Sequence, residues 1–246
     1  NGVASITVYK GYYDGDTLNF ALQQDGFFYN TTINVYAVDI LKPAIFDVNN
    51  DGDIDVISFN SSGNRLNYYE NQRVELGLKC DSLYFKNVDQ CWGNVEDTFS
   101  SSFSLRDTCD LKFGLRQEQI LHIGSSIDAV DADNNGVTDL LIGSVSLSHL
   151  TMLYNFGSTT YASILKQDGN YPSYNVPYNV SAFASPYFID ADNDGKKDLL
   201  VSNFDVSSSN FNNIWYYKNT RNDSINLVLQ QKNFLLDNTI DAGENS

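Results

Sequence analysis

The chain has 246 residues and a formal net charge of −16 at pH 7. A chain this acidic repels nucleic-acid phosphate, which argues against a nucleic-acid-binding role. No run of residues approaches the roughly 20 apolar residues of a membrane-spanning helix, so no membrane span is expected. Abundant Gly, Asn, Asp, Ser and aromatic residues, with only four Pro and one Met, favour an all-β fold of short strands joined by polar turns.

The first predicted strands, at residues 8–11 and 16–24, both return near the end of the chain. Residues 16–24 match 223–231 at a constant offset of 207 residues, and 8–11 match 216–219 within one residue. Three repeats in 207 residues average 69 residues each, which suits a four-stranded unit with its loops. We expect the sequence to start in the last strands of one repeat, and its opening residues show no signal-peptide pattern.

Three acid-rich loops mark the repeats, at residues 47–55, 131–139 and 190–198. Each loop follows a short apolar strand and precedes another, so each is predicted to be the turn of a β-hairpin. The strands before the loops are expected at 43–46, 126–130 and 186–189, those after them at 56–59, 140–143 and 199–202, and an aromatic-rich third strand at 66–71, 152–155 and 215–219.

The loops have the ligand pattern of a site for a hard cation such as Ca²⁺. Side-chain oxygens at the first, third, fifth and ninth positions and a backbone carbonyl at the seventh would surround one point, and Gly at the sixth allows the sharp turn. Eleven of the 31 acidic residues lie in the loops, so we expect about three calcium sites. The predicted ligands are Asp47, Asn49, Asp51, Asp53 and Asp55; Asp131, Asp133, Asn135, Val137 and Asp139; and Asp190, Asp192, Asp194, Lys196 and Asp198.

The loops differ in charge. The third has four ligand carboxylates, whereas the first and second have three each. Because affinity for calcium rises with ligand charge, the third loop is expected to bind calcium most tightly.

The second repeat starts late, because 84 residues separate the first two loops and only 59 separate the next two. This difference predicts an insertion at about residues 78–117, which contains all three cysteines. We expect a disulfide between Cys91 and Cys109, worth roughly 3 kcal/mol, with Cys80 as the alternative partner. No Cys-x-x-Cys pair or nearby histidine suggests zinc.

Four-stranded repeats of this size predict a β-propeller, in which such units pack radially as blades. The chain would supply about three to four blades of a larger ring, expected to have about seven. Three repeats would leave strand edges uncovered, so we expect further chain, from the same or another polypeptide, to cover them.

The pattern Asp-x-[Asp/Asn]-x-[Asp/Asn]-Gly-x-x-Asp, flanked by apolar strands, resembles the VCBS/FG-GAP family of calcium-binding β-propeller repeats. A single copy could equally be an EF-hand or dockerin-like loop, but the pattern occurs three times and the helices of an EF-hand are not expected here. More narrowly, residues 91–93, 190–200 and 215–219 resemble large Bacteroidota proteins that the type IX system exports through a C-terminal sorting domain, which this chain does not contain. That resemblance implies a secreted or cell-surface protein.

The same group of proteins carries an O-glycosylation signal, Asp-[Ser/Thr]-apolar. The chain has three similar stretches, which make Thr17, Ser82 and Ser224 candidate acceptors. The alternative is that they are polar turns at strand entries, because so short a motif is weak evidence.

The leading functional hypothesis is a non-enzymatic, calcium-stabilised propeller module that binds another protein or a glycan at the cell surface. No Gly-x-Ser-x-Gly elbow or phosphate loop is present. Two alternatives stay open: a polysaccharide lyase or hydrolase built on the same scaffold, and a cargo or component of a secretion or surface complex.

Overall fold

The structure is a computed structural model that describes residues 6–29, 33–35, 37, 41–98, 102–106, 108–109, 125–145, 147–179, 183–203 and 212–235. Within these ranges the chain forms β-strands, and its one helical element is a 3-10 turn at Trp92–Asn94. The described ranges contain no helix with the length and apolar character that crossing a bilayer requires. The prediction of an all-β fold is confirmed.

Three antiparallel meanders of four consecutive strands make up most of the fold. The first contains β6 (Ala44–Phe46), β7 (Asp55–Phe59), β8 (Leu66–Asn71) and β9 (Phe85–Asp89). The second contains β12 (Ser125–Val130), β13 (Asp139–Ser144), β14 (Leu150–Asn155) and β15 (Ile164–Tyr171). The third contains β16 (Ala184–Ile189), β17 (Asp198–Asn203), β18 (Ile214–Asn219) and β19 (Leu227–Gln231).

The remaining strands extend these sheets or stand apart from them. The pair β3 (Phe28–Tyr29) and β4 (Ile33–Asn34) continues the first sheet beyond β9, and β5 (Leu41–Lys42) pairs in parallel with β12. Two hairpins form separate two-stranded sheets: β1 (Val8–Asp14) with β2 (Thr17–Gln24), and β10 (Val95–Asp97) with β11 (Phe103–Leu105). Residues 78–117 therefore contain the fourth strand of the first meander as well as β10 and β11.

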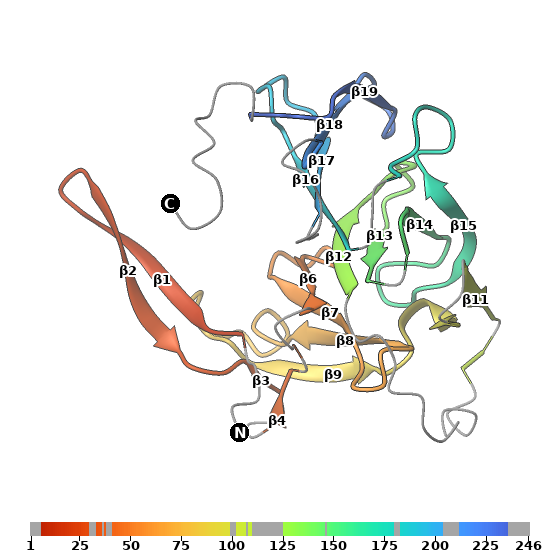
Figure 1. Ribbon diagram of the computed structural model, residues 1–246. Helices are drawn as coiled ribbons and strands as arrows, with labels where there is room; N and C mark the ends of the chain where they lie inside the picture. The colour runs from red at the N-terminus through yellow and green to blue at the C-terminus, as the bar shows by residue number, and fades with distance from the viewer. Residues whose placement is uncertain are drawn as a thin grey trace.

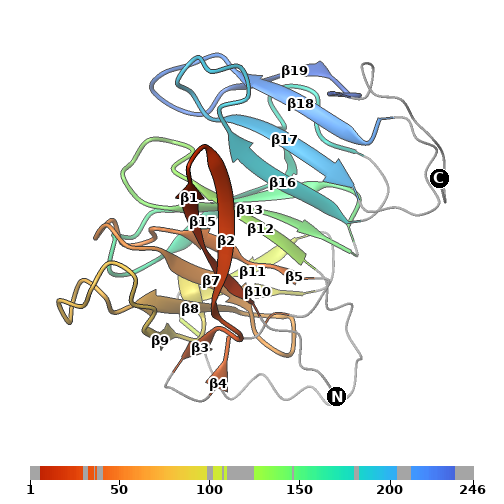
Figure 2. The same cartoon turned by 90° about the vertical axis from the view of Figure 1, so that its left-hand side faces the viewer.

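The three meanders lie side by side along an arc (Figure 1). Their first strands, β6, β12 and β16, lie on the inner side of this arc, and β9, β15 and β19 lie on its outer side. A view turned by 90° shows the sheets stacked one above another, with the hairpin of β1 and β2 standing across their edges (Figure 2). The inner strands also contact one another, since β12 packs against both β6 and β16.

Two apolar cores separate the meanders, because alternate residues of each strand point to opposite faces. Ile57 and Tyr68 face the core between the first and second sheets, together with Leu140. Leu141, one residue further on, faces the core between the second and third sheets, where it packs with Tyr217. The middle sheet is therefore buried on both faces, which explains why β13 is apolar without alternation.

One glycine sets the distance between the second and third sheets. A Cβ atom on Gly143 of β13 would lie about 1.9 Å from the carbonyl oxygen of Ala184 in β16. Any larger residue at this position would force the two sheets apart, so the sheet interface depends on Gly143.

Candidate metal centres

Each acid-rich loop is the turn of a β-hairpin. In each hairpin, the last two residues that pair before the turn are the residue preceding the loop and the ninth loop residue. These pairs are Phe46 with Asp55, Val130 with Asp139, and Ile189 with Asp198. The three loops therefore start from the same place in the same pair of strands, namely the first and second strands of each meander.

The backbone of the three turns is the same at the positions that need unusual dihedral angles. The fourth residue is Asn in each loop, with φ between 60° and 61°, and the sixth is Gly, with φ between 85° and 94°. Asn tolerates the left-handed region better than most residues, and Gly adopts it without a steric penalty. Local sequence thus determines the shape of the turn.

The first loop residue holds the turn together. Its two carboxylate oxygens accept hydrogen bonds from the backbone N–H groups of the fifth and sixth residues, at 2.9 to 3.1 Å, in all three loops. The third and fifth side chains accept further backbone N–H bonds, from the fifth and seventh residues respectively. As a result, the side-chain oxygens at the first, third and fifth positions converge on the inside of the turn.

The ninth residue joins the loop to the third strand. Asp55, Asp139 and Asp198 are fully buried. In each, one oxygen accepts the N–H of the second loop residue and the other accepts the N–H of the last residue of the third strand; the donors are Val48 and Asn71, Ala132 and Asn155, and Ala191 and Asn219. Burial raises the pKa of Asp55 and Asp139 to about 7, against the opposing effect of these hydrogen bonds.

In the described part of the chain, three groups of carboxylates lie close enough to hold one cation, with candidate ligand atoms within 4.8 Å of one another. The second loop provides Asp131, Asp133 and Asp139, and the third provides Asp190, Asp192 and Asp194. The first group differs from the prediction, since it consists of Asp51, Asp53 and Glu75. All three groups offer only oxygen ligands.

Several predicted ligands lie outside these groups of three. Asp47 accepts the N–H groups of its own turn, while Asp55 and Asp198 join their loops to the third strands. Of the remaining predicted ligands, Asn49, Asn135, Val137 and Lys196 could contribute only amide or backbone oxygens, and all four lie in the same turns.

Two lysines lie beside the acids of the third loop. Lys196 Nζ lies 2.6 Å from Asp194 Oδ2, and Lys218 Nζ contacts both Asp192 and Asp194. The hydrogen bond from Lys196 lowers the pKa of Asp194 to about 2. These cations compete with a metal ion for the carboxylates, so the charge count of the loop alone overstates its expected affinity.

The first loop has an acid where the third loop has Lys218, although Arg73 also lies beside it. Glu70 occupies the place in β8 that Lys218 occupies in β18, and its Oε1 lies 3.4 Å from Asn49 Nδ2. Sequence reasoning missed both Glu70 and Glu75. Glu70 could have been found by aligning the third strands, Tyr-Tyr-Glu-Asn with Tyr-Tyr-Lys-Asn, whereas no local pattern marks Glu75.

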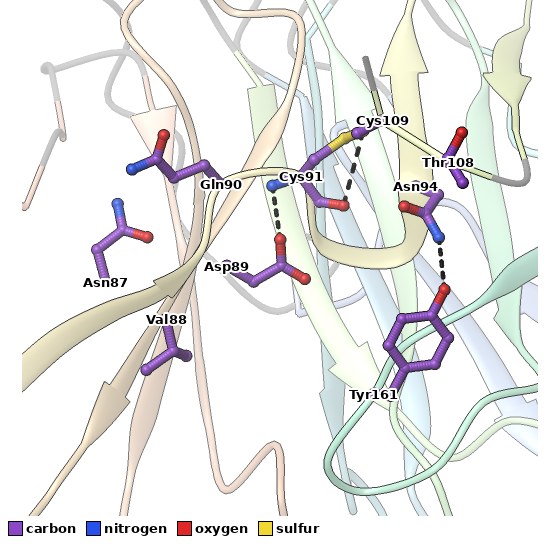
Figure 3. Close-up of a pocket in the computed structure, with 9 residues that line it drawn as sticks. All are labelled: Asn87, Val88, Asp89, Gln90, Cys91, Asn94, Thr108, Cys109 and Tyr161. Atoms are coloured by element: carbon purple, nitrogen blue, oxygen red, sulfur yellow. Dashed lines mark hydrogen bonds between the residues drawn. A yellow bond between two sulfur atoms is a disulfide. The ribbon is translucent and has the colours of Figure 1, made fainter. Parts of the chain in front are cut away.

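The predicted disulfide between Cys91 and Cys109 is present, with a Cα–Cα distance of 6.3 Å, and Cys80 is an exposed free thiol. A hollow of about 460 Å³ lies beside this bond (Figure 3). Across it, Asn94 Nδ2 donates a 3.0 Å hydrogen bond to the hydroxyl of Tyr161. Its lining includes a single carboxylate, that of Asp89, so the hollow is separate from the acid-rich loops.

The candidate glycosylation residues differ in accessibility. Thr17 is exposed at the first position of β2, whereas Ser82 and Ser224 are half-buried in turns. Thr17 is therefore the most accessible of the three acceptor hydroxyls.

Comparison of the sequence with protein-family models found no matching family, and a search among curated proteins found no match either. The family resemblance of the loops therefore stays a prediction, and the case for a function comes from the geometry of the loops.

Proposed function

We propose that the chain is a calcium-stabilised module of a secreted or cell-surface protein, which presents its loops to a protein or glycan partner and does not catalyse a reaction. One observation carries this proposal: the same turn, with the same backbone hydrogen bonds, recurs in three meanders, and a group of three carboxylates lies at each of them.

The donor set favours a hard cation such as calcium over a soft or borderline metal. Each group consists of carboxylates, with no histidine or cysteine among the described members. Soft or borderline metals such as zinc prefer nitrogen and sulfur, whereas calcium takes six to eight oxygen ligands in flexible geometry. The turns could supply the remaining oxygens from amide side chains and backbone carbonyls.

Binding would stabilise the fold through the turn. The ninth residue of each loop already joins the first hairpin to the third strand. A cation held by the same turn would bind the folded state and not the unfolded chain, which stabilises the folded state by mass action.

We also propose that the meanders are blades of a β-propeller. Their inner strands lie along one side of an arc, and neighbouring sheets share apolar cores, as radially packed blades do (Figure 1). The strands β1 and β2 pair in the same register as β18 and β19, the last two strands of the third meander. This match supports a fourth unit of the same kind. The disulfide is in keeping with an oxidising, extracellular location.

A thermal melt with and without calcium tests the calcium proposal. We expect a chelator to lower the melting temperature and added Ca²⁺ to restore it. Each occupied site should add about 2.7 kcal/mol to the free energy of unfolding when free calcium is 100 times its Kd. Asp133→Ala, in the second loop, should remove part of this gain. Asp14→Asn removes the same charge from β1, away from any loop, and should leave the gain unchanged. Equal melting temperatures in chelator and calcium would refute the proposal.

A further inference from the structure

We propose that the first acid-rich loop is a cation site built from two segments, in which Glu75 from the connection between β8 and β9 joins the carboxylates of the loop. A divalent cation bound there would hold residues 72–78 against the turn. This inference rests on the proposed calcium binding by the loops, and it assigns to the first site a ligand and a consequence that the other two sites lack.

Glu75 lies beside two aspartates of the first loop. Its carboxylate and those of Asp51 and Asp53 form a group whose candidate ligand atoms all lie within 4.8 Å of one another. Glu75 lies 20 or more residues from both aspartates in sequence, so the loop alone does not create the group.

Asp53 supplies independent evidence for a ligand. It is only 4% exposed, and its Oδ1 is buried without a hydrogen-bond partner among the described residues. The other oxygen, Oδ2, accepts the backbone N–H of Val74 at 3.1 Å and lies 3.6 Å from Arg73 Nε. A buried carboxylate oxygen without a partner is costly, and a cation shared with Asp51 and Glu75 would satisfy it.

Two hydrogen bonds hold the connection against the loop. Arg73 donates one, of 2.8 Å, to the backbone carbonyl of Gly52, and the backbone N–H of Val74 donates the other to Asp53. These contacts hold the residues just before Glu75 beside the turn. Glu75 is itself exposed, so a cation would be its strongest link to the loop.

The third meander shows the alternative arrangement. Asn71 and Asn219 end the equivalent strands, and an acid follows four residues later in both, Glu75 in one and Asp223 in the other. Asp223 pairs instead with Arg221, at 2.7 and 2.8 Å, and takes no part in the carboxylate group of its loop. The equivalent position in the second meander is Thr159, so only the first site has an acid from this connection in its carboxylate group.

A consequence follows for the surface. The connection carries Val74, Leu76 and Leu78, which are 39% to 56% exposed. If a cation joins Glu75 to the turn, the placement of these apolar side chains depends on calcium, and the first site controls a surface segment as well as stability.

The test compares Glu75→Gln with Asp223→Asn, which occupies the matching place in the third meander. Calcium titration by calorimetry gives the number and affinity of sites, and hydrogen exchange of the peptide covering 72–78 reports the connection. For the unmodified chain we expect calcium to slow exchange in 72–78. Glu75→Gln should weaken one site by about tenfold or more and abolish this protection, whereas Asp223→Asn should change neither.

Glu75→Gln with unchanged affinity and unchanged protection would overturn the inference. If instead no loop of the unmodified chain binds calcium, the proposed function fails as well, and the absence of any titration signal identifies that outcome. Should Glu75→Gln fail to fold, exchange in the unmodified chain still decides, because calcium must protect 72–78 and leave the equivalent segment 220–226 unprotected.

Discussion

At the residue scale, the aspartates of the third loop divide into two kinds. The ninth residue is fully buried and accepts the backbone N–H groups of the second loop residue and of the last residue of the third strand, so its main role is to hold the turn against the third strand. Asp190, Asp192 and Asp194 lie nearer the surface and form the cation group of the third loop. In the third loop, stability and the proposed metal binding therefore depend on different residues.

Substitutions in the third loop separate these roles. Asp198→Ala leaves the N–H groups of Ala191 and Asn219 without their acceptor, which should cost about 1–3 kcal/mol of unfolding free energy even in chelator. Asp192→Ala should cost little in chelator but should reduce the stabilisation by calcium. Chemical denaturation in both conditions measures the two effects, and equal losses for the two variants in chelator would contradict this division.

At the element scale, the hairpin of β1 and β2 repeats the geometry of β18 and β19. Tyr9 pairs with Leu22 as Tyr217 pairs with Leu229, and both hairpins have a register shift immediately before this pair. Their environments differ, because Tyr217 is fully buried while Tyr9 is 58% exposed. The strands alone therefore specify the hairpin, and burial depends on what packs against it.

Equivalent positions in the two hairpins give a direct comparison. Leu227 is fully buried and Phe20, its counterpart, is 65% exposed. Leu227→Ala should lower the unfolding free energy by about 2–5 kcal/mol, whereas Phe20→Ala should change it by less than about 0.5 kcal/mol. Denaturant unfolding of both variants checks this, and a large loss for Phe20→Ala would mean that β1 and β2 are packed in solution.

At the scale of the whole molecule, stability comes from cores shared between neighbouring sheets. Ile127 and Leu153 in the second meander pack against Ile57 of the first, while Met152 packs against Val201 of the third. No meander buries both of its faces alone. Cooperative unfolding of the three is expected, because each sheet supplies one wall of a core that its neighbour needs.

The disulfide is a covalent addition to this arrangement. It joins residues 18 apart in sequence, so breaking it should cost roughly 3 kcal/mol. Cys109→Ser should lower the denaturation midpoint accordingly, and Cys80→Ser, which removes an exposed free thiol, should not. If Cys80→Ser had the larger effect, the pairing in solution would differ from Cys91–Cys109.

The sequence by itself determined the strands that flank the loops and the turns between them. Hairpins depend on residues close together in the chain: apolar alternation, an Asn and a Gly at positive φ, and an aspartate that caps its own turn. These signals are complete within about 20 residues. They therefore predicted the strand–loop–strand units and the carboxylates of the second and third groups, Asp131 and Asp190 among them.

Only the tertiary structure decided what surrounds each turn. Glu75 reaches the first loop through a separate connection, and Lys218 reaches the third loop from a neighbouring strand. No local pattern encodes either contact, since both depend on how strands distant in sequence pair and where their connections then run. For the same reason Glu75, Glu70 and Lys218 alter the charge around the loops although they lie outside the nine-residue motif, because Coulomb interactions depend on distance in space and not on distance along the chain.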